Sequence, residues 1–300
     1  MKASLVVLLV AIACVGQTAA ASRVEVPSTG VIYGGLGSWV DIFDGAARSA
    51  PEQVVATLRR HGVTTLYLQT SNYSQHADIV GPRIVGSFID AAHAAGINVV
   101  AWYLPSLAHP RIDARRTRAA LRFRSSTGQS FDSVALDIEA SLVRDVRLRN
   151  SRLLELARQL RLAAGDGYPL GAIVPSPVGM RTHPRYWPGF PFRELAADFD
   201  AFLPMAYFSY HAKTPAAVYT YARDVVTAIR RGTERADVTV HLIGGIANRI
   251  SPPKLDAFIR AAQQCGVAGL SLYAYPETSN TQWAGMGAAT LGGTPAPVCD

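Results

Sequence analysis

One stretch decides the fold: Phe131-Asp132-Ser133-Val134-Ala135-Leu136-Asp137-Ile138-Glu139-Ala140. It has the pattern of a buried β-strand with two carboxylates at its carboxyl end. Because strand side chains alternate between faces, the stretch divides into two sets. The apolar face consists of Val134, Leu136 and Ile138, and the other face consists of Ser133, Ala135, Asp137 and Glu139. Two acids two residues apart would repel each other inside an apolar core, so we expect Asp137 and Glu139 to face a solvent-filled cleft.

The amino terminus has the pattern of a secretory signal peptide. Lys2 precedes an apolar run from Ala3 to Val15, and small residues follow up to Ala21. We therefore expect residues 1–21 to be removed and the protein to be secreted into the extracellular space. The apolar run is too short for a permanent span, so no stable membrane insertion is expected. Cys14 lies in this run, but Ala11 stands where a lipobox usually has leucine, so we do not expect a lipid anchor.

Composition indicates one globular domain, which we place at residues 22–300. With 49% hydrophobic and 17% charged residues, about 280 residues can fill the core of one α/β barrel. The formal charge of +7 is carried almost wholly by arginine. Arginines at helical spacing are more often solvated helix faces than binding sites, so no nucleic-acid partner is expected. We expect the protein to be a monomer.

Cysteines and metal-ligand patterns are sparse. Cys265 and Cys299 are the only cysteines left after removal of the signal peptide, and in an oxidising compartment we expect them to form a disulfide. No His, Asp and Glu cluster has ligand spacing, and there is no glycine-rich phosphate loop. We therefore expect neither a metal nor another cofactor.

The remaining chain repeats a β-rich run, a loop and an amphipathic helical run. The expected strands are 39–43, 64–71, 97–104, 131–140, 170–174, 201–207, 238–243 and 270–275. Helices are expected from a Ser49–Glu52 capping box, over 79–95, 113–124, 143–164 and 192–197, from Thr214-Pro215, from Ser251-Pro252, and over 281–291. Eight strands alternating with helices predict the α/β class and a single (β/α)8 TIM barrel.

A proline-rich segment interrupts this repeat. Five prolines between positions 175 and 191 exclude a long helix there. We expect an extended loop with Tyr186 and Trp187 at its tip, and long loops on a rigid scaffold often carry function.

Barrel enzymes hold their catalytic groups at the carboxyl ends of the strands, where Asp137 and Glu139 are expected. The same reasoning on the other strands gives a set of inward polar and aromatic side chains: Asp41, Gln69, Ser71, Trp102 or Tyr103, Met205, Tyr207, Tyr273 and Tyr275. His241 on the seventh strand is interpreted as a core histidine with satisfied hydrogen bonds. Two acids ringed by aromatic and amide groups suit a carbohydrate substrate, whose apolar ring faces stack on aromatic side chains.

Two motifs resemble a known family. Asp132-x-x-Ala135-x-Asp137-x-Glu139 resembles the fourth-strand signature Asp-x-x-Asp-x-Asp-x-Glu of the chitinase family of glycoside hydrolases, family 18. The segment Phe199–Tyr207 is similar to that family's sixth strand with its Met-x-Tyr. The resemblance implies that Glu139 is the general acid and that Asp137 orients a substrate acetamido group acting as internal nucleophile. It also implies that Tyr207 bonds near the reacting carbon.

The sequence departs from the family pattern at three positions and leaves alternatives open. Ala135 replaces an acid, Phe208 replaces an aspartate, and Tyr273 stands in place of a tryptophan. A lysozyme-like muramidase would use Asp137 and Glu139 with Asp41 from the first strand. A carbohydrate-binding barrel without turnover is a further alternative, although two retained acids favour a hydrolase. In a hydrolase we expect an ionised Asp137 to raise the pKa of Glu139, so that Glu139 stays protonated near neutral pH.

Overall fold

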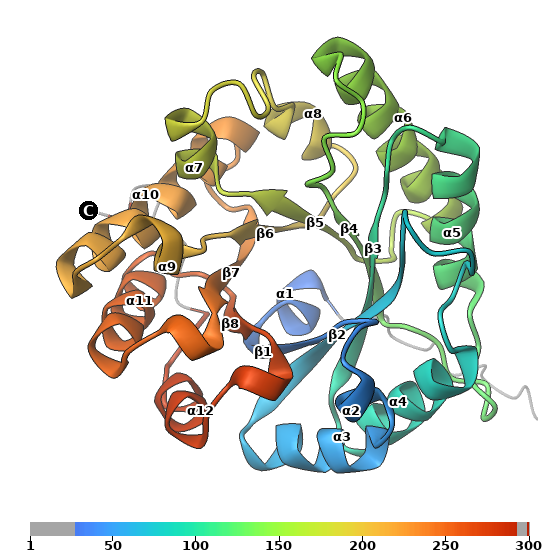
Figure 1. Cartoon of the computed structure of the whole chain (residues 1–300), viewed down its shortest axis with the longest axis horizontal. Coiled ribbons are helices and arrows are strands. Elements are labelled where there is room, and N and C mark those ends of the chain that lie inside the picture. The colour runs from blue at the N-terminus through green and yellow to red at the C-terminus, as the bar shows by residue number, and fades with distance from the viewer. Residues whose placement is uncertain (1–27, 293–298, 300) are drawn as a thin grey trace, which may run out of the picture.

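Eight parallel strands close into one barrel with helices around its outside (Figure 1). The computed structural model describes residues 28–292 and Cys299. The strands are β1 (Gly35–Val40), β2 (Val63–Asn72), β3 (Asn98–Leu104), β4 (Ser133–Asp137), β5 (Leu170–Pro175), β6 (Ala201–Met205), β7 (Thr239–Ile246) and β8 (Gly269–Tyr273). Each pairs in parallel with the next, and β1 pairs with β8, which closes the sheet. The predicted single (β/α)8 barrel is therefore confirmed.

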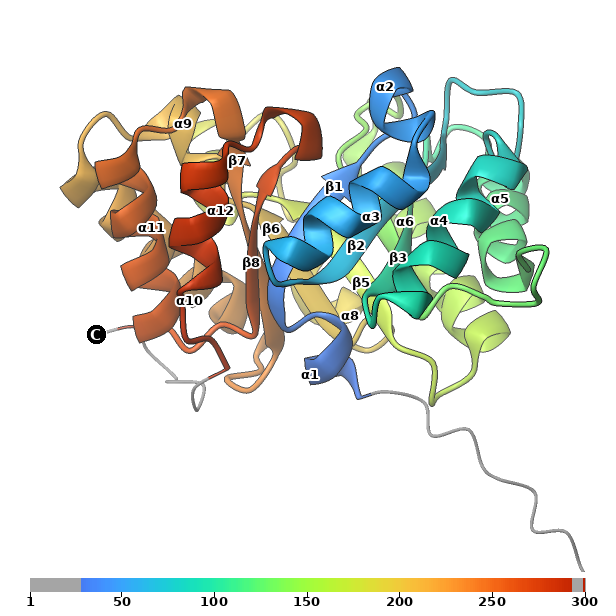
Figure 2. The same ribbon diagram turned by 90° about the horizontal axis from the view of Figure 1, so that it is seen from below.

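Helices cover the outside of this sheet. The longer ones are α3 (Pro51–Arg60), α4 (Pro82–Ala94), α5 (Pro110–Arg122), α6 (Val146–Ala164), α10 (Pro215–Thr233), α11 (Pro252–Gln264) and α12 (Asn280–Gly287). Shorter helices are α1 (Thr29–Ile32), α2 (Gly45–Arg48), α7 (Pro177–Thr182), α8 (Phe192–Leu195), α9 (Phe208–His211), η1 (Ala247–Arg249) and η2 (Tyr275–Glu277). Figure 2 shows α1 at one end of the barrel and α2 and α9 at the other, where the strands finish.

Large aromatic side chains fill the interior of the barrel. Tyr33, at the end of α1, enters from the amino-terminal end of the strands, and its hydroxyl lies 2.5 Å from Ser133 Oγ. Trp39 stacks on Tyr67 with ring centroids 4.1 Å apart. His241 Nδ1 lies 2.9 Å from the Tyr33 carbonyl, to which it can only donate, and burial lowers the pKa of His241 to about 4. His241 is thus a neutral core residue, as predicted.

Glycine is required where these aromatic groups press against the strands. A Cβ atom at Gly269 would collide with His241 Nδ1 and with the Tyr33 carbonyl oxygen. We expect Gly269→Ala to lower the free energy of unfolding by about 3 kcal/mol, the upper part of the overpacking range. Gly167→Ala is the control, since nothing lies within 4 Å of an added Cβ there. Urea unfolding measures both variants, and equal stabilities would refute this account of the interior.

Several predicted boundaries were wrong for identifiable reasons. β1 ends at Val40 rather than at residue 43, because the Asp41 carboxylate accepts hydrogen bonds from the Phe43 and Asp44 amides and turns the chain. The Ser49 hydroxyl bonds to the Ala46 carbonyl, so the expected capping box does not form and α3 begins at Pro51.

Other helix starts follow their local chemistry. Thr214 caps α10 as predicted, accepting from the Ala217 amide at 3.2 Å. Asp145 caps α6, which starts three residues later than expected, at Val146. The capping box that does form is at α12, where Ser279 and Gln282 bond reciprocally.

A disulfide joins Cys265 at the end of α11 to Cys299, with Cα atoms 4.8 Å apart. This is the pair for which the sequence predicted a bond. A sequence separation of 34 residues corresponds to about 4 kcal/mol in the chain-entropy model of disulfide stabilisation. We expect a Cys265→Ser/Cys299→Ser protein to lose stability of that order in urea unfolding. An unchanged unfolding midpoint in the double variant, or two free thiols by mass spectrometry of exported protein, would contradict it.

The expected signal peptide at residues 1–21, with Cys14, lies outside the described residues. Within residues 28–292, no helix has both the length and the apolar character needed to cross a membrane.

Candidate active site

The site begins with the alternation along β4. Val134, Leu136 and Ile138 pack outward in the core between the sheet and the helices, whereas Ala135 belongs to the cluster inside the barrel. Asp137 continues the inward face at the last residue of the strand. The amide of Ile138 still bonds to the Ile173 carbonyl of β5 at 2.8 Å, and Glu139 follows it. Both acids therefore reach the carboxyl end of the barrel.

Asp132, the first acid of the same motif, lies at the opposite end of β4 and has a different role. Its Oδ2 accepts from the Val99 amide at 2.7 Å and lies 2.9 Å from His93 Nε2. It thereby ties β3 and α4 to the start of β4. Asp132 is a structural residue, far along the strand from Asp137.

Glu139 lines a cavity of about 370 Å³ at the carboxyl ends of β4, β5 and β6. The other residues that line it come from the ends of these strands and from α7 and α9 and their neighbouring loops: Pro175, Ser176, Gly179, Met180, His183, Tyr186, Met205, Tyr207, Tyr210 and His211. The walls are mainly aromatic and apolar, and they include neither lysine nor arginine. The cavity therefore combines a carboxyl group with ring faces.

Burial dominates the electrostatics of the acid pair. It raises the pKa of Asp137 well above the ordinary value, and the neighbouring Glu139 raises it further. Burial also raises the pKa of Glu139. Asp137 is 7% exposed and its Oδ1 has no hydrogen-bond partner among the described residues, whereas Glu139 is only half-buried. An ionised Asp137 would thus be an uncompensated buried charge, so Asp137 is the preferred site for a proton in the unliganded pair.

This distribution differs from the sequence expectation of an ionised Asp137 beside a protonated Glu139. The physical reason is that Ala135, the preceding inward-facing residue of β4, offers Asp137 neither a charge nor a hydrogen-bond donor. Because Oδ1 of Asp137 has no hydrogen-bond partner within the described part of the chain, burial decides the charge of this carboxyl.

The sixth strand was predicted to reach Tyr207, but β6 ends at Met205 and Tyr207 is the N-cap of α9. Both side chains line the cavity. Burial raises the pKa of Tyr207, and the charges of Asp137 and Glu139 add to it. The phenol therefore stays protonated and can donate a hydrogen bond beside the two acids.

A second group joins β1, β2 and β8. The Tyr273 hydroxyl donates to Asp41 Oδ2 at 2.7 Å, and Gln69 Oε1 accepts from the Ile42 amide at 3.0 Å. None of these three residues lines the cavity of Glu139. Burial raises the pKa of Tyr273, the hydrogen bond to Asp41 and its charge raise it further, and Tyr207 and Asp137 add smaller contributions. Asp41 and Tyr273 are thus joined near the carboxyl ends of β1 and β8, with Gln69 buried beside them at 2% exposure.

Tyr103 and Tyr275 were wrongly predicted as site residues, because both pack in or against the outer core. Of the adjacent pair Trp102 and Tyr103, it is Trp102 that faces inward. Trp102 lies inside the barrel, edge-on to Trp39 at 5.9 Å, with its Nε1 buried and without a partner among the described residues. Tyr103 points outward and donates to buried Asp113 at 2.6 Å. Tyr275 packs against the outer core, because β8 ends at Tyr273 and strand alternation does not continue into η2.

Ser71 also departs from the inward pattern. Its hydroxyl donates to the Ala77 carbonyl at 2.8 Å in the loop after β2. The pairing of β2 with β3 shifts between Gln69 and Ser71, which breaks the simple alternation of faces there.

Sequence reasoning missed the cavity wall formed by α7, α9 and the loop between α7 and α8. The prolines marked this segment as a loop, but Pro177 instead starts the short helix α7, capped by Ser176. Tyr186 does reach the site, and its hydroxyl donates to the Glu139 main-chain carbonyl at 2.5 Å. Trp187 was predicted at the tip of an extended loop, but it is 2% exposed and its ring packs against the Arg149 guanidinium. Within the described part of the chain, no group of three or more His, Cys, Asp or Glu side chains could hold a metal ion.

Comparison with known proteins finds solved structures of similar fold but no similar sequence. No family model and no curated protein matches the sequence. The fold is similar to an endo-1,4-beta-mannanase from Rhizomucor miehei, with a TM-score of 0.63 and 10% identity over 85% of this chain and 94% of that chain. A class V chitinase from Pseudomonas fluorescens has a TM-score of 0.62 and 11% identity, over 85% of this chain and 99% of that chain. The spore cortex-lytic enzyme SleL of Bacillus cereus has a TM-score of 0.62 and 8% identity, over 86% of this chain and 75% of that chain. At these identities the likeness establishes the fold alone.

Proposed function

We propose that this protein is a secreted glycoside hydrolase that cleaves a polysaccharide or a cell-wall glycan. The observation that carries the proposal is the Asp137–Glu139 pair at the end of β4, with Glu139 in a cavity walled by aromatic side chains. The signal-peptide pattern supports secretion. The chitinase and the mannanase that share the fold are named for polysaccharide substrates, which supports the substrate class.

In the proposed reaction Glu139 is the general acid. It transfers its proton to the glycosidic oxygen as the bond from that oxygen to the anomeric carbon breaks. If the substrate carries an acetamido group, its carbonyl oxygen attacks the anomeric carbon, and Asp137 stabilises the positive charge that develops on the acetamido nitrogen. Glu139, now ionised, then takes a proton from the water that opens the intermediate. Tyr207 donates a hydrogen bond near the reacting carbon.

The raised pKa values of the pair fit this sequence. One proton is retained by the two carboxyls at a pH where ordinary carboxyls are ionised. In the unliganded protein this proton favours Asp137, so substrate binding must bring it to Glu139, whose carboxyl lines the cavity. The pair then supplies one acid and one charge, as a glycosidase needs.

The cavity favours sugar units without charge. Its lining holds Glu139 as an acid and no lysine or arginine to bind a polyanion. Burial and then the neighbouring His183 lower the pKa of His211, which keeps His211 neutral near pH 7. Tyr186, Tyr207 and Tyr210 offer ring faces of the kind on which sugars stack.

A binding protein without turnover is the second candidate, because Ala135 stands where the family resemblance has an acid. The experiment that separates the two is a screen of the purified protein on chitin oligosaccharides, mannan and peptidoglycan. It measures both new reducing ends and retention on the insoluble polymer. A hydrolase releases reducing ends from at least one of them. Retention without any release supports the binding protein and overturns the proposed function.

A further inference from the structure

We infer that Tyr186 is a positioning residue for Glu139 and that α6 holds it in place through Arg149 and Asn150. The inference rests on the proposed function only in taking Glu139 as the reacting acid. The segment concerned is residues 183–190, called the covering loop below, which runs between α7 and α8.

The first contact is made at Glu139 itself. β4 ends at Asp137, so Glu139 lies beyond the strand. The Tyr186 hydroxyl donates to its main-chain carbonyl at 2.5 Å, across 47 positions of sequence. Tyr186 and Glu139 line the same cavity. The tyrosine therefore fixes the backbone from which the acid projects and covers it on one side.

The covering loop is bonded to Arg149 and Asn150, near the start of α6. Arg149 Nη2 donates to the Tyr186 carbonyl at 2.8 Å, and its guanidinium lies 3.9 Å from the centre of the Trp187 ring. Trp187 Nε1 donates to Asn150 Oδ1 at 2.7 Å, and Asn150 Nδ2 donates to the Gly189 carbonyl at 2.8 Å. Arg149 and Trp187 are each 2% exposed. A cation–π contact and hydrogen bonds that are shielded from solvent therefore attach the covering loop to α6.

The attachment is separate from the substrate cavity. Trp187 lines a neighbouring apolar pocket of about 380 Å³, and neither Arg149 nor Trp187 is among the residues that line the cavity of Glu139. A change at Arg149 therefore leaves the residues that line this cavity in place, and its hydrogen bond to the Tyr186 carbonyl links it to the covering loop. This separation makes the inference testable with a residue that substrate does not touch.

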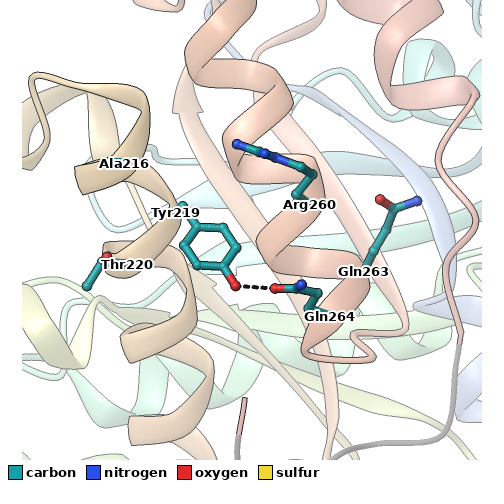
Figure 3. A pocket seen from close by; sticks show the side chains of 6 residues that line it. All are labelled: Ala216, Tyr219, Thr220, Arg260, Gln263 and Gln264. Atoms are coloured by element: carbon teal, nitrogen blue, oxygen red, sulfur yellow. Dashed lines mark hydrogen bonds between the residues drawn. The ribbon is translucent and has the colours of Figure 1, made fainter. Parts of the chain in front are cut away.

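Two variants and two matched controls test it. Tyr186→Phe removes one hydroxyl and keeps the ring, and Arg149→Met removes the attachment but keeps an apolar stem over Trp187. Tyr219→Phe is the first control, because its hydroxyl also bonds to a distant side chain, Gln264, in the outer helix layer (Figure 3). Arg158→Met is the second control, since Arg158 lies on the same helix, exposed and paired with Glu155.

The first readout needs no substrate. Carbon-13 labelling of glutamate allows the Glu139 carboxyl to be titrated by NMR, with the signal assigned by its loss in Glu139→Gln. Burial raises the Glu139 pKa, so releasing the covering loop in Arg149→Met should lower it toward the ordinary value of 4.5. Tyr186→Phe should leave this titration in place but shift the carbonyl-carbon signal of the Glu139 main chain. Both controls should titrate as the parent does.

The second readout is kinetic. On a glycan that the parent cleaves, Tyr186→Phe should lower kcat about tenfold with KM unchanged, as expected for one well-placed hydrogen bond that holds a reacting group. Arg149→Met should lower kcat at least as much and move the basic limb of its pH profile to lower pH. Parent-like kcat in Tyr186→Phe, or an unmoved Glu139 titration in folded Arg149→Met, overturns the inference. Absence of any hydrolysis by the parent refutes the proposed function instead, and the NMR titration still decides the positioning.

Discussion

Replacing Glu139 with glutamine is expected to lower kcat on a natural glycan about 10² to 10⁴-fold, the usual contribution of a general acid. The amide has nearly the shape of the acid, and Glu139 is half-buried at the cavity wall, so the fold and the cavity should persist. What disappears is the proton for the departing oxygen. The leaving group would then depart as an unstable alkoxide.

The dependence on leaving group distinguishes this loss from general damage. An aryl glycoside whose phenolate leaves without a proton should be cleaved by Glu139→Gln within about tenfold of the parent rate. Steady-state kinetics on the glycan and on the aryl glycoside measure the contrast. Equal losses on both substrates would assign Glu139 a structural role rather than that of the acid.

The second large effect is expected at Asp137, where activity and stability should move in opposite directions. Asp137→Asn should lower kcat about 10²-fold, because the pair loses a carboxyl that holds the shared proton and stabilises developing charge. The same change should make the protein more stable at neutral pH. Asp137 is 7% exposed and its Oδ1 has no partner among the described residues, and asparagine removes the cost of keeping this carboxyl protonated, or charged, in a buried place.

The sign of the pH dependence follows from linkage. Burial raises the folded-state pKa of Asp137 above its unfolded value, so between the two the folded protein binds more protons than the unfolded one. This part of the stability is complete below the unfolded pKa and is lost as the pH rises through the folded pKa. We therefore expect the melting temperatures of parent and Asp137→Asn to be close near pH 4 and to separate in favour of the variant as the pH rises.

Asp132→Asn is the matched control on the same strand. Asp132 accepts from the Val99 amide and pairs with His93, so its amide variant loses stabilising contacts and should melt below the parent. Thermal unfolding followed by circular dichroism from pH 4 to pH 8 measures all three proteins. An Asp137→Asn protein that is less stable than the parent at pH 8 would contradict the assignment of a buried, uncompensated carboxyl.

The fold was predictable because its signals are local and repeated. The alternation along β4 correctly predicted which side chains face inward and which face outward, because its outward residues are large and apolar and its inward residues are small or acidic. β3 lacks that contrast. Trp102 and Tyr103 are adjacent aromatic residues, and only the register of β3 against β2 and β4 determines that Trp102 faces inward.

The cavity wall was less predictable because it depends on contacts between distant segments. Tyr186 reaches Glu139 only through the packing of the covering loop on α6, which sequence spacing does not encode. The charge state of the acid pair was missed for a related reason. Which carboxyl keeps the proton depends on the burial of Asp137 and on the lack of a donor to its Oδ1 among residues 28–292, both properties of the packed barrel.

The most direct test of the central claim compares turnover and binding of one glycan by the parent and by Glu139→Gln. Product release by mass spectrometry and affinity by calorimetry are measured on the same preparation. The account predicts that the parent cleaves the glycan, while the variant binds it with similar affinity and releases product at least about 100-fold more slowly. Cleavage by Glu139→Gln at the parent rate would contradict the account.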